Sequence, residues 1–105
     1  GWWAMALLDD VKLALRISFG TTVYDGEVQD LIAAAKADLK RAGVDPAKVD
    51  ADDGNLDPLI KQAIVTYAKW RFGFDNPDAD RLSKAYEQLV ADLTLSQEYL
   101  PPKEA

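Results

Sequence analysis

Apolar residues recur at the three- and four-residue spacing of an amphipathic helix in four separate stretches of this 105-residue chain. The expected helices cover residues 7–17, 26–42, 57–72 and 76–96. Glycine, proline and Asn-Pro breakers separate these stretches, and none shows the sustained two-residue alternation of a strand. The predicted fold class is therefore all-α: a small bundle of four main helices, with an acidic loop, residues 44–56, between the second and the third.

Both ends of the second helix carry local signals. Asp25 is expected to cap its first turn through the side-chain carboxylate. Gly43 is expected to end it in the left-handed conformation. Leu39 and Val44 then occupy the two positions whose apolar contact accompanies a Schellman motif, so this is the most sharply predicted boundary in the chain.

The third helix is apolar around most of its circumference. It begins with a favoured pair, Asp57 as the cap and Pro58 in the first helical position. Its polar strip consists of Gln62, Thr66 and Lys69. A helix that is apolar over so much of its surface is central in a bundle or buried in an assembly.

The composition excludes most kinds of chemistry. The chain has no His and no Cys, which excludes disulfides, thiolate or imidazole zinc sites, cysteine nucleophiles and a Ser-His-Asp triad. Its 12 basic and 18 acidic residues give a net charge of −6, which argues against binding to the phosphate backbone of nucleic acids. The length indicates a single domain.

The remaining routes to a metal site or to catalysis fail on spacing. Placing Gly54 at the sixth position of a calcium-binding loop puts Ile60, not Glu, at the twelfth. The glutamates never pair at the i, i+3 spacing that helical Mg²⁺-dependent pyrophosphohydrolases use. Basic residues on the second helix alternate with aspartates, which favours a solvated face over a DNA-reading helix. We therefore expect no enzyme, no cofactor and no metal, and we expect the acidic loop to be solvated and mobile.

Aromatic residues gather at the end of the third helix. Core packing with cation–π contacts accounts for part of this cluster. Four aromatic residues within eight positions are nevertheless hard to bury in a bundle of this size, and excess aromatic surface beside an arginine is typical of interfaces. The candidate subunit interface consists of Tyr67, Trp70, Arg71, Phe72 and Phe74.

The two ends of the chain are expected to lie outside the domain. We expect residues 1–4 to be a remnant of cloning, the alternative being a native arm whose two tryptophans dock on a partner. Residues 5–96 form the single helical domain, and residues 97–105 form a flexible tail because two adjacent prolines prevent a helix. No apolar run is long enough to cross a bilayer, and the start has no basic region typical of a signal peptide.

The order and spacing of these elements resemble those of a known family. The sequence VKLALRI at residues 11–17 is similar to the VKxxLRI helix of the head–tail connector proteins of tailed bacteriophages, also called DNA-packaging or head-completion proteins. Residues 57–67, DPLIKQAIVTY, followed by Phe72-Gly73, are similar to the family's DPLIxxAIxxY…FG stretch. Residues 79–89 are similar to its AxRxxxxYExL segment. The resemblance covers residues 5–99 and is greatest to the connectors of Gram-positive bacteria and their prophages.

The resemblance implies a structural protein of the virion, made in the cytoplasm of the bacterial host. Such proteins form a ring, typically a dodecamer, that docks beneath the portal protein after packaging, extends the DNA channel and joins the head to the next stopper or tail component. DNA passes through without sequence-specific binding. A subunit can stay monomeric until a portal template is present.

Two further groups of residues receive roles under this resemblance. The acidic loop is expected to face the lumen, where negative charge lowers friction against DNA, or to become ordered against a partner; its residues are Asp45, Asp50, Asp52 and Asp53. The tail is expected either to bind the portal or another partner, or to be a frayed terminus without a role. Its candidate residues are Gln97, Glu98, Tyr99 and Leu100.

One different class of function stays open at this point. The chain also fits a small helical binding or regulatory protein, such as an antitoxin-like or adaptor module, acting as a monomer or dimer without a portal partner.

Overall fold

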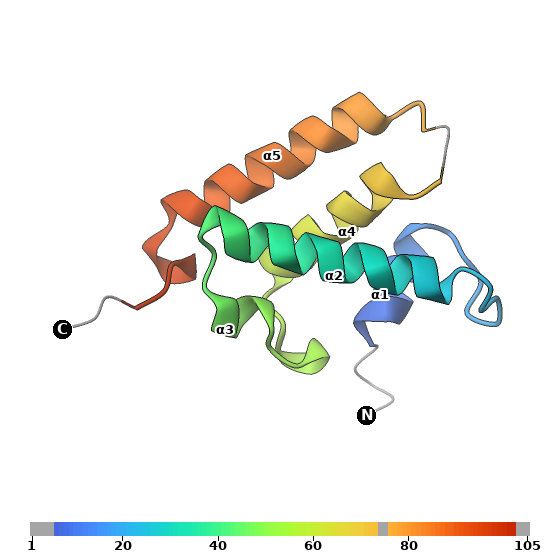
Figure 1. Ribbon diagram of the computed structural model, residues 1–105, viewed down its shortest axis with the longest axis horizontal. Helices are drawn as coiled ribbons and strands as arrows, with labels where there is room; N and C mark the ends of the chain where they lie inside the picture. Colours follow the sequence, from blue (N-terminus) through green and yellow to red (C-terminus); the bar gives the residue numbers. More distant parts are fainter. Residues whose placement is uncertain (1–5, 74–75, 103–105) are drawn as a thin grey trace.

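The computed structural model describes residues 6–73 and 76–102. In order, the elements are α1 (Leu7–Ala14), α2 (Asp25–Ala42), α3 (Pro46–Val49), the 3₁₀ turn η1 (Asp53–Asn55), α4 (Pro58–Arg71), α5 (Ala79–Leu95) and the 3₁₀ turn η2 (Gln97–Tyr99). Figure 1 shows these helices with no strand among the described residues, so the all-α prediction is confirmed.

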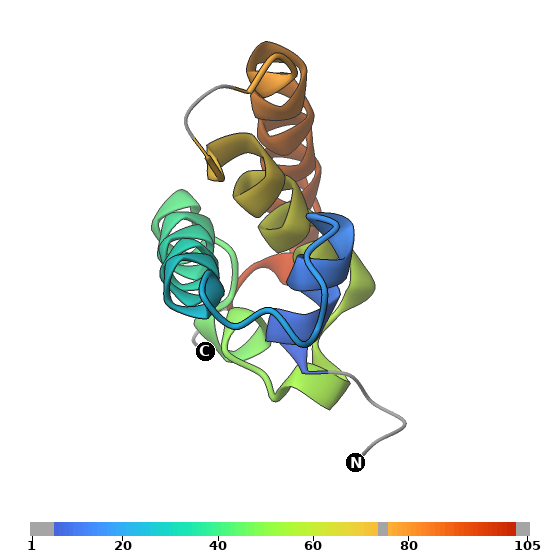
Figure 2. The ribbon, with the colours of Figure 1, turned by 90° about the vertical axis from the view of Figure 1, so that its right-hand side faces the viewer.

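Helix α4 is the centre of the bundle. It packs against α5, α2 and α1, and Figure 2 shows it between α5 on one side and α1 and α2 on the other. Its residues Ile60, Ala63, Ile64 and Ala68 are completely buried. This position explains its apolar circumference, because three helices cover it within a single chain.

Helix α1 ends earlier than the apolar spacing predicts. Its last helical residue is Ala14, and Arg16 has a positive φ of 62°. The N–H of Ile17 donates to the carbonyl of Lys12 at 2.8 Å, and the N–H of Arg16 donates to that of Leu13 at 3.0 Å. These two bonds form a Schellman motif with arginine where glycine is usual, so the chain reverses before Ile17 can extend the helix.

The start of α2 differs from the prediction, whereas its end agrees. Asp25 is the first helical residue, and the N-cap is Tyr24, which makes no side-chain capping bond. The expected capping role of Asp25 is therefore wrong. Gly43 ends the helix at a φ of 113°, and the N–H of Val44 donates to the carbonyl of Leu39 at 3.0 Å, as the Schellman prediction requires.

Asn76 links the end of α4 to the start of α5. Its side-chain amide donates to the carbonyl of Lys69 at 2.8 Å and to that of Trp70 at 3.2 Å. Its side-chain oxygen accepts from the N–H of Asp78 at 3.0 Å. One side chain thus satisfies free backbone groups of both helices, and α5 begins at Ala79 rather than at Asn76.

The acidic segment between α2 and α4 is not the solvated, mobile loop that the sequence indicates. It contains α3 and η1, and Val44, Val49 and Leu56 are buried in the main core. The aspartates dominate its composition, but the three apolar residues between them fix it to the rest of the domain. No described helix is long and apolar enough to span a membrane.

Candidate functional site

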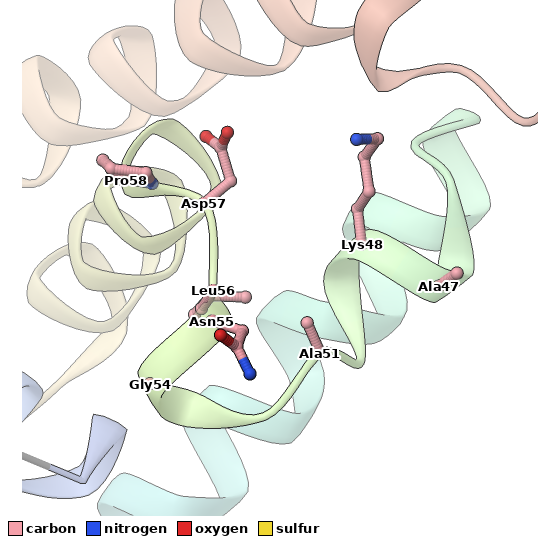
Figure 3. A pocket seen from close by; sticks show the side chains of 8 residues that line it. All are labelled: Ala47, Lys48, Ala51, Gly54, Asn55, Leu56, Asp57 and Pro58. Carbon is pink, nitrogen blue, oxygen red and sulfur yellow. The ribbon is translucent and has the colours of Figure 1, made fainter. Parts of the chain in front are cut away.

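A pocket of about 540 Å³ lies between α3 and the start of α4. In Figure 3, Lys48 and Asp57 stand on its two sides, with Ala51, Asn55 and Leu56 between them. The lining residues are Ala47, Lys48, Ala51, Gly54, Asn55, Leu56, Asp57 and Pro58. The described residues hold no group of three or more acidic, histidine or cysteine side chains that could bind a metal ion.

Asp57 already has two structural roles beside this pocket. Its Oδ1 accepts from the N–H of Leu59 at 2.8 Å, which confirms the predicted cap of α4. The hydroxyl of Tyr99 donates to both carboxylate oxygens at 3.1 Å. Burial raises the pKa of this hydroxyl, and the bond to Asp57 raises it further.

The C-terminal residues close this network on the other side. The carbonyl of Tyr99 accepts from the N–H of Asp45 at 2.8 Å, and the side chain of Tyr99 belongs to the core. Gln97 begins the turn η2, Glu98 is exposed and Leu100 is half-buried. The domain therefore continues past Ser96 in the structure, and Tyr99 joins both ends of the acidic segment.

Three of the four candidate acidic residues have hydrogen-bond partners within the chain. Asp45 caps α3 by accepting from the N–H of Ala47 at 3.1 Å. Asp50 accepts from the ammonium of Lys40 at 3.0 and 3.2 Å. Asp53 Oδ2 accepts from the N–H of Leu7 at 2.9 Å.

The contact of Asp53 stabilises the start of α1 from a distant part of the chain. The N-cap of α1 is Ala6, which has no side-chain acceptor to offer. Asp53 supplies that acceptor, and its negative charge also favours a helix N-terminus. Asp52 is exposed and makes no capping bond at η1.

The aromatic cluster at the end of α4 is organised around Tyr86 of α5. Tyr67, Trp70 and Tyr86 lie with their ring centroids 5.2–6.0 Å apart, two of the three pairs edge to face. The guanidinium of Arg71 lies 5.7 Å from the centroid of Tyr67 and 5.1 Å from that of Trp70. Tyr67 and Trp70 are half-buried and Arg71 is exposed, so the cluster is part core and part surface. Phe74 lies outside the described residues.

The hydroxyl of Tyr86 connects this cluster to α2. It donates to Asp38 Oδ2 at 2.6 Å, and the other carboxylate oxygen of Asp38 pairs with Arg41. Burial raises the pKa of Tyr86 far above its usual value, and the bond to Asp38 adds to the shift. The same hydrogen bond is the main cause that lowers the pKa of Asp38.

Sequence reasoning missed the α1–α2 loop, residues 18–24, next to the aromatic cluster. The ring of Tyr24 meets that of Phe72 edge to face at 5.7 Å between centroids. Phe19 and Val23 are exposed on the same loop. An available signal was the run from Ser18 to Tyr24, which has apolar residues and no charge between two helices.

The buried side chain of Lys12 fixes the conformation of that loop. Its side chain is only 2% exposed, and its ammonium donates to the carbonyl of Thr21 at 2.7 Å and to that of Phe19 at 3.4 Å. It also forms an ion pair of 2.8 Å with Asp25 Oδ1. This pair is what occupies the carboxylate of Asp25 in place of a cap.

These features define a small all-helical protein with apolar and aromatic surface at one end and a capped acidic segment at the other. Comparison with known proteins gives the family. The family model described as phage connector protein matches residues 7–100, and the chain belongs to that family. This match confirms the resemblance to phage head–tail connectors, which are structural proteins. Neither a curated protein nor a solved structure gives a significant match.

Proposed function

We propose that this protein is a ring-forming adaptor at the head–tail junction of a virion, where it docks beneath the portal and extends the DNA channel. The observation that carries the proposal is the family match over residues 7–100. The type of connector is that of Gram-positive hosts and their prophages. The subunits are made in the host cytoplasm and act in the virion as structural parts, without catalysis.

The ring contacts are head to tail, so one surface of each subunit meets a different surface of the next. The first surface is the aromatic end of α4, with Phe74 next to it in sequence. Half-buried rings and an exposed Arg71 above them support this choice, since tryptophan, tyrosine and arginine are enriched among the residues that contribute most to binding at interfaces. The second surface is the outer face of α2 or α5.

The charge of the chain supports passage of DNA without retention. Proteins bind the DNA backbone when basic side chains neutralise phosphates and release counterions. A chain with a net charge of −6 gains little from this release. Asp52 is the acidic residue of the 44–56 segment that best serves a lumen-facing role, because Asp45, Asp50 and Asp53 have structural partners.

The residues after Ser96 are the proposed contact with the portal or with the next tail component. Glu98 and Leu100 are available for this role, whereas Tyr99 stabilises the core. Deletion of residues 97–105 would therefore confuse loss of binding with loss of folding. The sharper variant is Glu98→Ala with Leu100→Ala, which keeps Tyr99.

The test is assembly on a portal template. Purified protein is mixed with DNA-filled heads that carry the portal, and bound subunits are measured by sedimentation and viewed by negative-stain microscopy. A ring at the portal vertex supports the proposal. A chain that stays a monomer or dimer and does not bind such heads contradicts it and favours the small binding or regulatory protein.

A further inference from the structure

Exposed apolar side chains are concentrated on one segment of the molecule. Six large apolar side chains are exposed among the described residues, and four of them lie between positions 13 and 24. Their exposed fractions are 61% for Leu13, 52% for Phe19, 79% for Val23 and 45% for Tyr24. Connections between helices are usually polar because they face water, and exposed apolar surface of this kind marks contacts with other proteins.

The loop that carries Phe19 and Val23 has a fixed shape. The buried ammonium of Lys12 binds the carbonyls of Phe19 and Thr21, and short turns close at Thr21 and Asp25. Burial of a charged lysine costs several kcal/mol of desolvation free energy, and its hydrogen bonds and ion pair offset about the same amount. A buried charge that orders an apolar loop is a form of preorganisation, which lowers the entropy lost on binding.

A receptor of suitable size lies elsewhere on the same chain. The pocket between α3 and α4 measures about 540 Å³, within the ~300–1,000 Å³ of sites that enclose drug-sized ligands. A phenyl ring is smaller than this volume and would lie against Ala51 and Leu56, with Lys48, Asn55 and Asp57 as polar neighbours. Figure 1 shows the α1–α2 loop at the right end of the molecule and α3 at the left, so the loop does not fill the pocket of its own chain.

We propose that the α1–α2 loop of one copy docks in the α3–α4 pocket of the next copy, with Phe19 entering the pocket. The inference rests on the proposed ring, in which every contact joins two different surfaces. The loop continues the aromatic end of α4 through the contact of Tyr24 with Phe72.

Charge complementarity favours a second copy of this chain as the occupant of the pocket. Arg16 is exposed at the base of the uncharged loop, Asp57 lines the pocket opposite Lys48, and the exposed Asp52 follows the lining residue Ala51 in sequence. Docking brings Arg16 to the acidic segment, where attraction sets the register of the contact.

The absence of cysteine makes a direct test possible, because every disulfide then comes from an introduced pair. Two single variants, Phe19→Cys and Ala51→Cys, are mixed under mild oxidation, with and without portal-bearing heads. The control mixes Phe19→Cys with Leu95→Cys, whose site is exposed on α5. We expect about tenfold more mixed disulfide for the first pair, a preference of ~1.4 kcal/mol. Equal yields, or more from the Leu95 pair, overturn the inference.

A second variant separates this inference from the proposed function. Phe19→Ser with Val23→Ser changes two exposed side chains and is expected to keep the helical circular dichroism and the thermal midpoint of the parent. We expect it to lose ring formation on portal-bearing heads. If the variant and the parent form equal rings, the docking inference is wrong and the ring proposal stands. If the parent forms no ring, the proposed function fails, and the disulfide yields still decide whether the two surfaces meet.

Discussion

At the scale of single residues, charged side chains do more for this structure than its composition indicates. Lys12 stands in a helix whose apolar spacing was the main signal, and yet it is the largest fully buried side chain of the described residues. The sequence predicts that Asp25 and Asp53 act as a local cap or a solvated acid, but each one contacts α1 from another part of the chain. These contacts were outside the reach of sequence reasoning, because nothing local shows which distant partner a charge will meet.

The first prediction concerns Lys12. The Lys12→Met variant removes a buried cation and leaves the Asp25 carboxylate and two carbonyls without it. We expect the free energy of unfolding to fall by about 3 kcal/mol, at the lower end for broken buried pairs because Asp25 keeps some access to water. The matched control is Lys61→Met, whose side chain is 37% exposed and pairs with Asp10 at 2.8 Å; because this ammonium keeps access to water, its loss should cost no more than ~1 kcal/mol. Urea denaturation measures both, and equal costs would contradict a special role for Lys12.

The second prediction compares two neighbouring aspartates. Asp53→Ala removes the acceptor that caps α1, and we expect a loss of about 1–2 kcal/mol. Asp52→Ala removes an equal charge without a capping bond and should change stability by less than ~0.5 kcal/mol. Thermal unfolding of the two variants in one buffer decides the matter. Similar losses would mean that net charge, not the cap, is responsible.

At the scale of elements, the helix ends show which local signals suffice. Gly43 and Asp57 end and begin their helices as predicted, because a left-handed residue and a side-chain cap act within a few positions. The end of α1 was predicted late, because Arg16 adopts a conformation that arginine does not favour. The charge of the segment 44–56 predicts a solvated loop, although its buried apolar residues decide where it lies.

The third prediction tests these two helix ends as a pair. Gly43→Ala places a side chain at a φ of 113° where no atom lies within 4 Å of the added Cβ, so the cost is backbone strain of about 1 kcal/mol. Arg16→Gly relieves strain at a φ of 62°, but glycine also gains conformational entropy in the unfolded chain, which offsets part of this relief. The net effect should be a stabilisation of up to ~0.5 kcal/mol. Denaturant midpoints should therefore move in opposite directions. A stabilising Gly43→Ala or a destabilising Arg16→Gly would contradict the backbone strain assigned to that end.

The fourth prediction concerns the link between α2 and α5. Tyr86→Phe removes the hydrogen bond to Asp38 and should cost about 1.5–2 kcal/mol at neutral pH, because the acceptor is charged. The pKa of Asp38 is lowered in the folded protein, so the ionised carboxylate contributes to the free energy of unfolding above pH ~4, and this contribution is lost below it. The pKa of Tyr86 is raised, so the protonated hydroxyl contributes to the free energy of unfolding below pH ~10, and this contribution is lost above it.

The variant should therefore show shallower losses of stability at both extremes of pH than the parent. Tyr24→Phe is the control, because its ring is exposed, and it should follow the parent curve. Unfolding free energies measured from pH 3 to pH 11 give the comparison. A Tyr86→Phe curve that is parallel to the parent at both extremes would show that the hydrogen bond does not shift either pKa.

At the scale of the whole molecule, the negative charge and the exposed loop point to different partners. The loop and the aromatic end of α4 present apolar surface suited to another protein. The net charge of −6 opposes contact with phosphates. The ring adaptor that we propose needs both properties, since its subunits would hold one another while DNA moves past them.

The fifth prediction follows from that charge. Neither the free subunit nor the assembled ring should retard linear double-stranded DNA in a gel-shift experiment at ~50 mM salt, where a backbone-binding protein would bind tightly. Rings on portal-bearing heads provide the assembled sample. Retardation that weakens as salt rises would contradict an acidic channel, because that dependence reports phosphates neutralised by basic side chains.

The sequence by itself left α4 either central in the bundle or buried in an assembly, but it determined the helical class, the cap at Asp57 and the stop at Gly43. Each depends on spacing within a few turns, and local backbone physics is sufficient for that. Only the tertiary structure decided that Lys12 orders the α1–α2 loop, that Asp53 caps α1 and that Tyr99 closes the acidic segment. The last two contacts join residues 46 and 42 positions apart, so their geometry exists only after α4 has brought the other helices together.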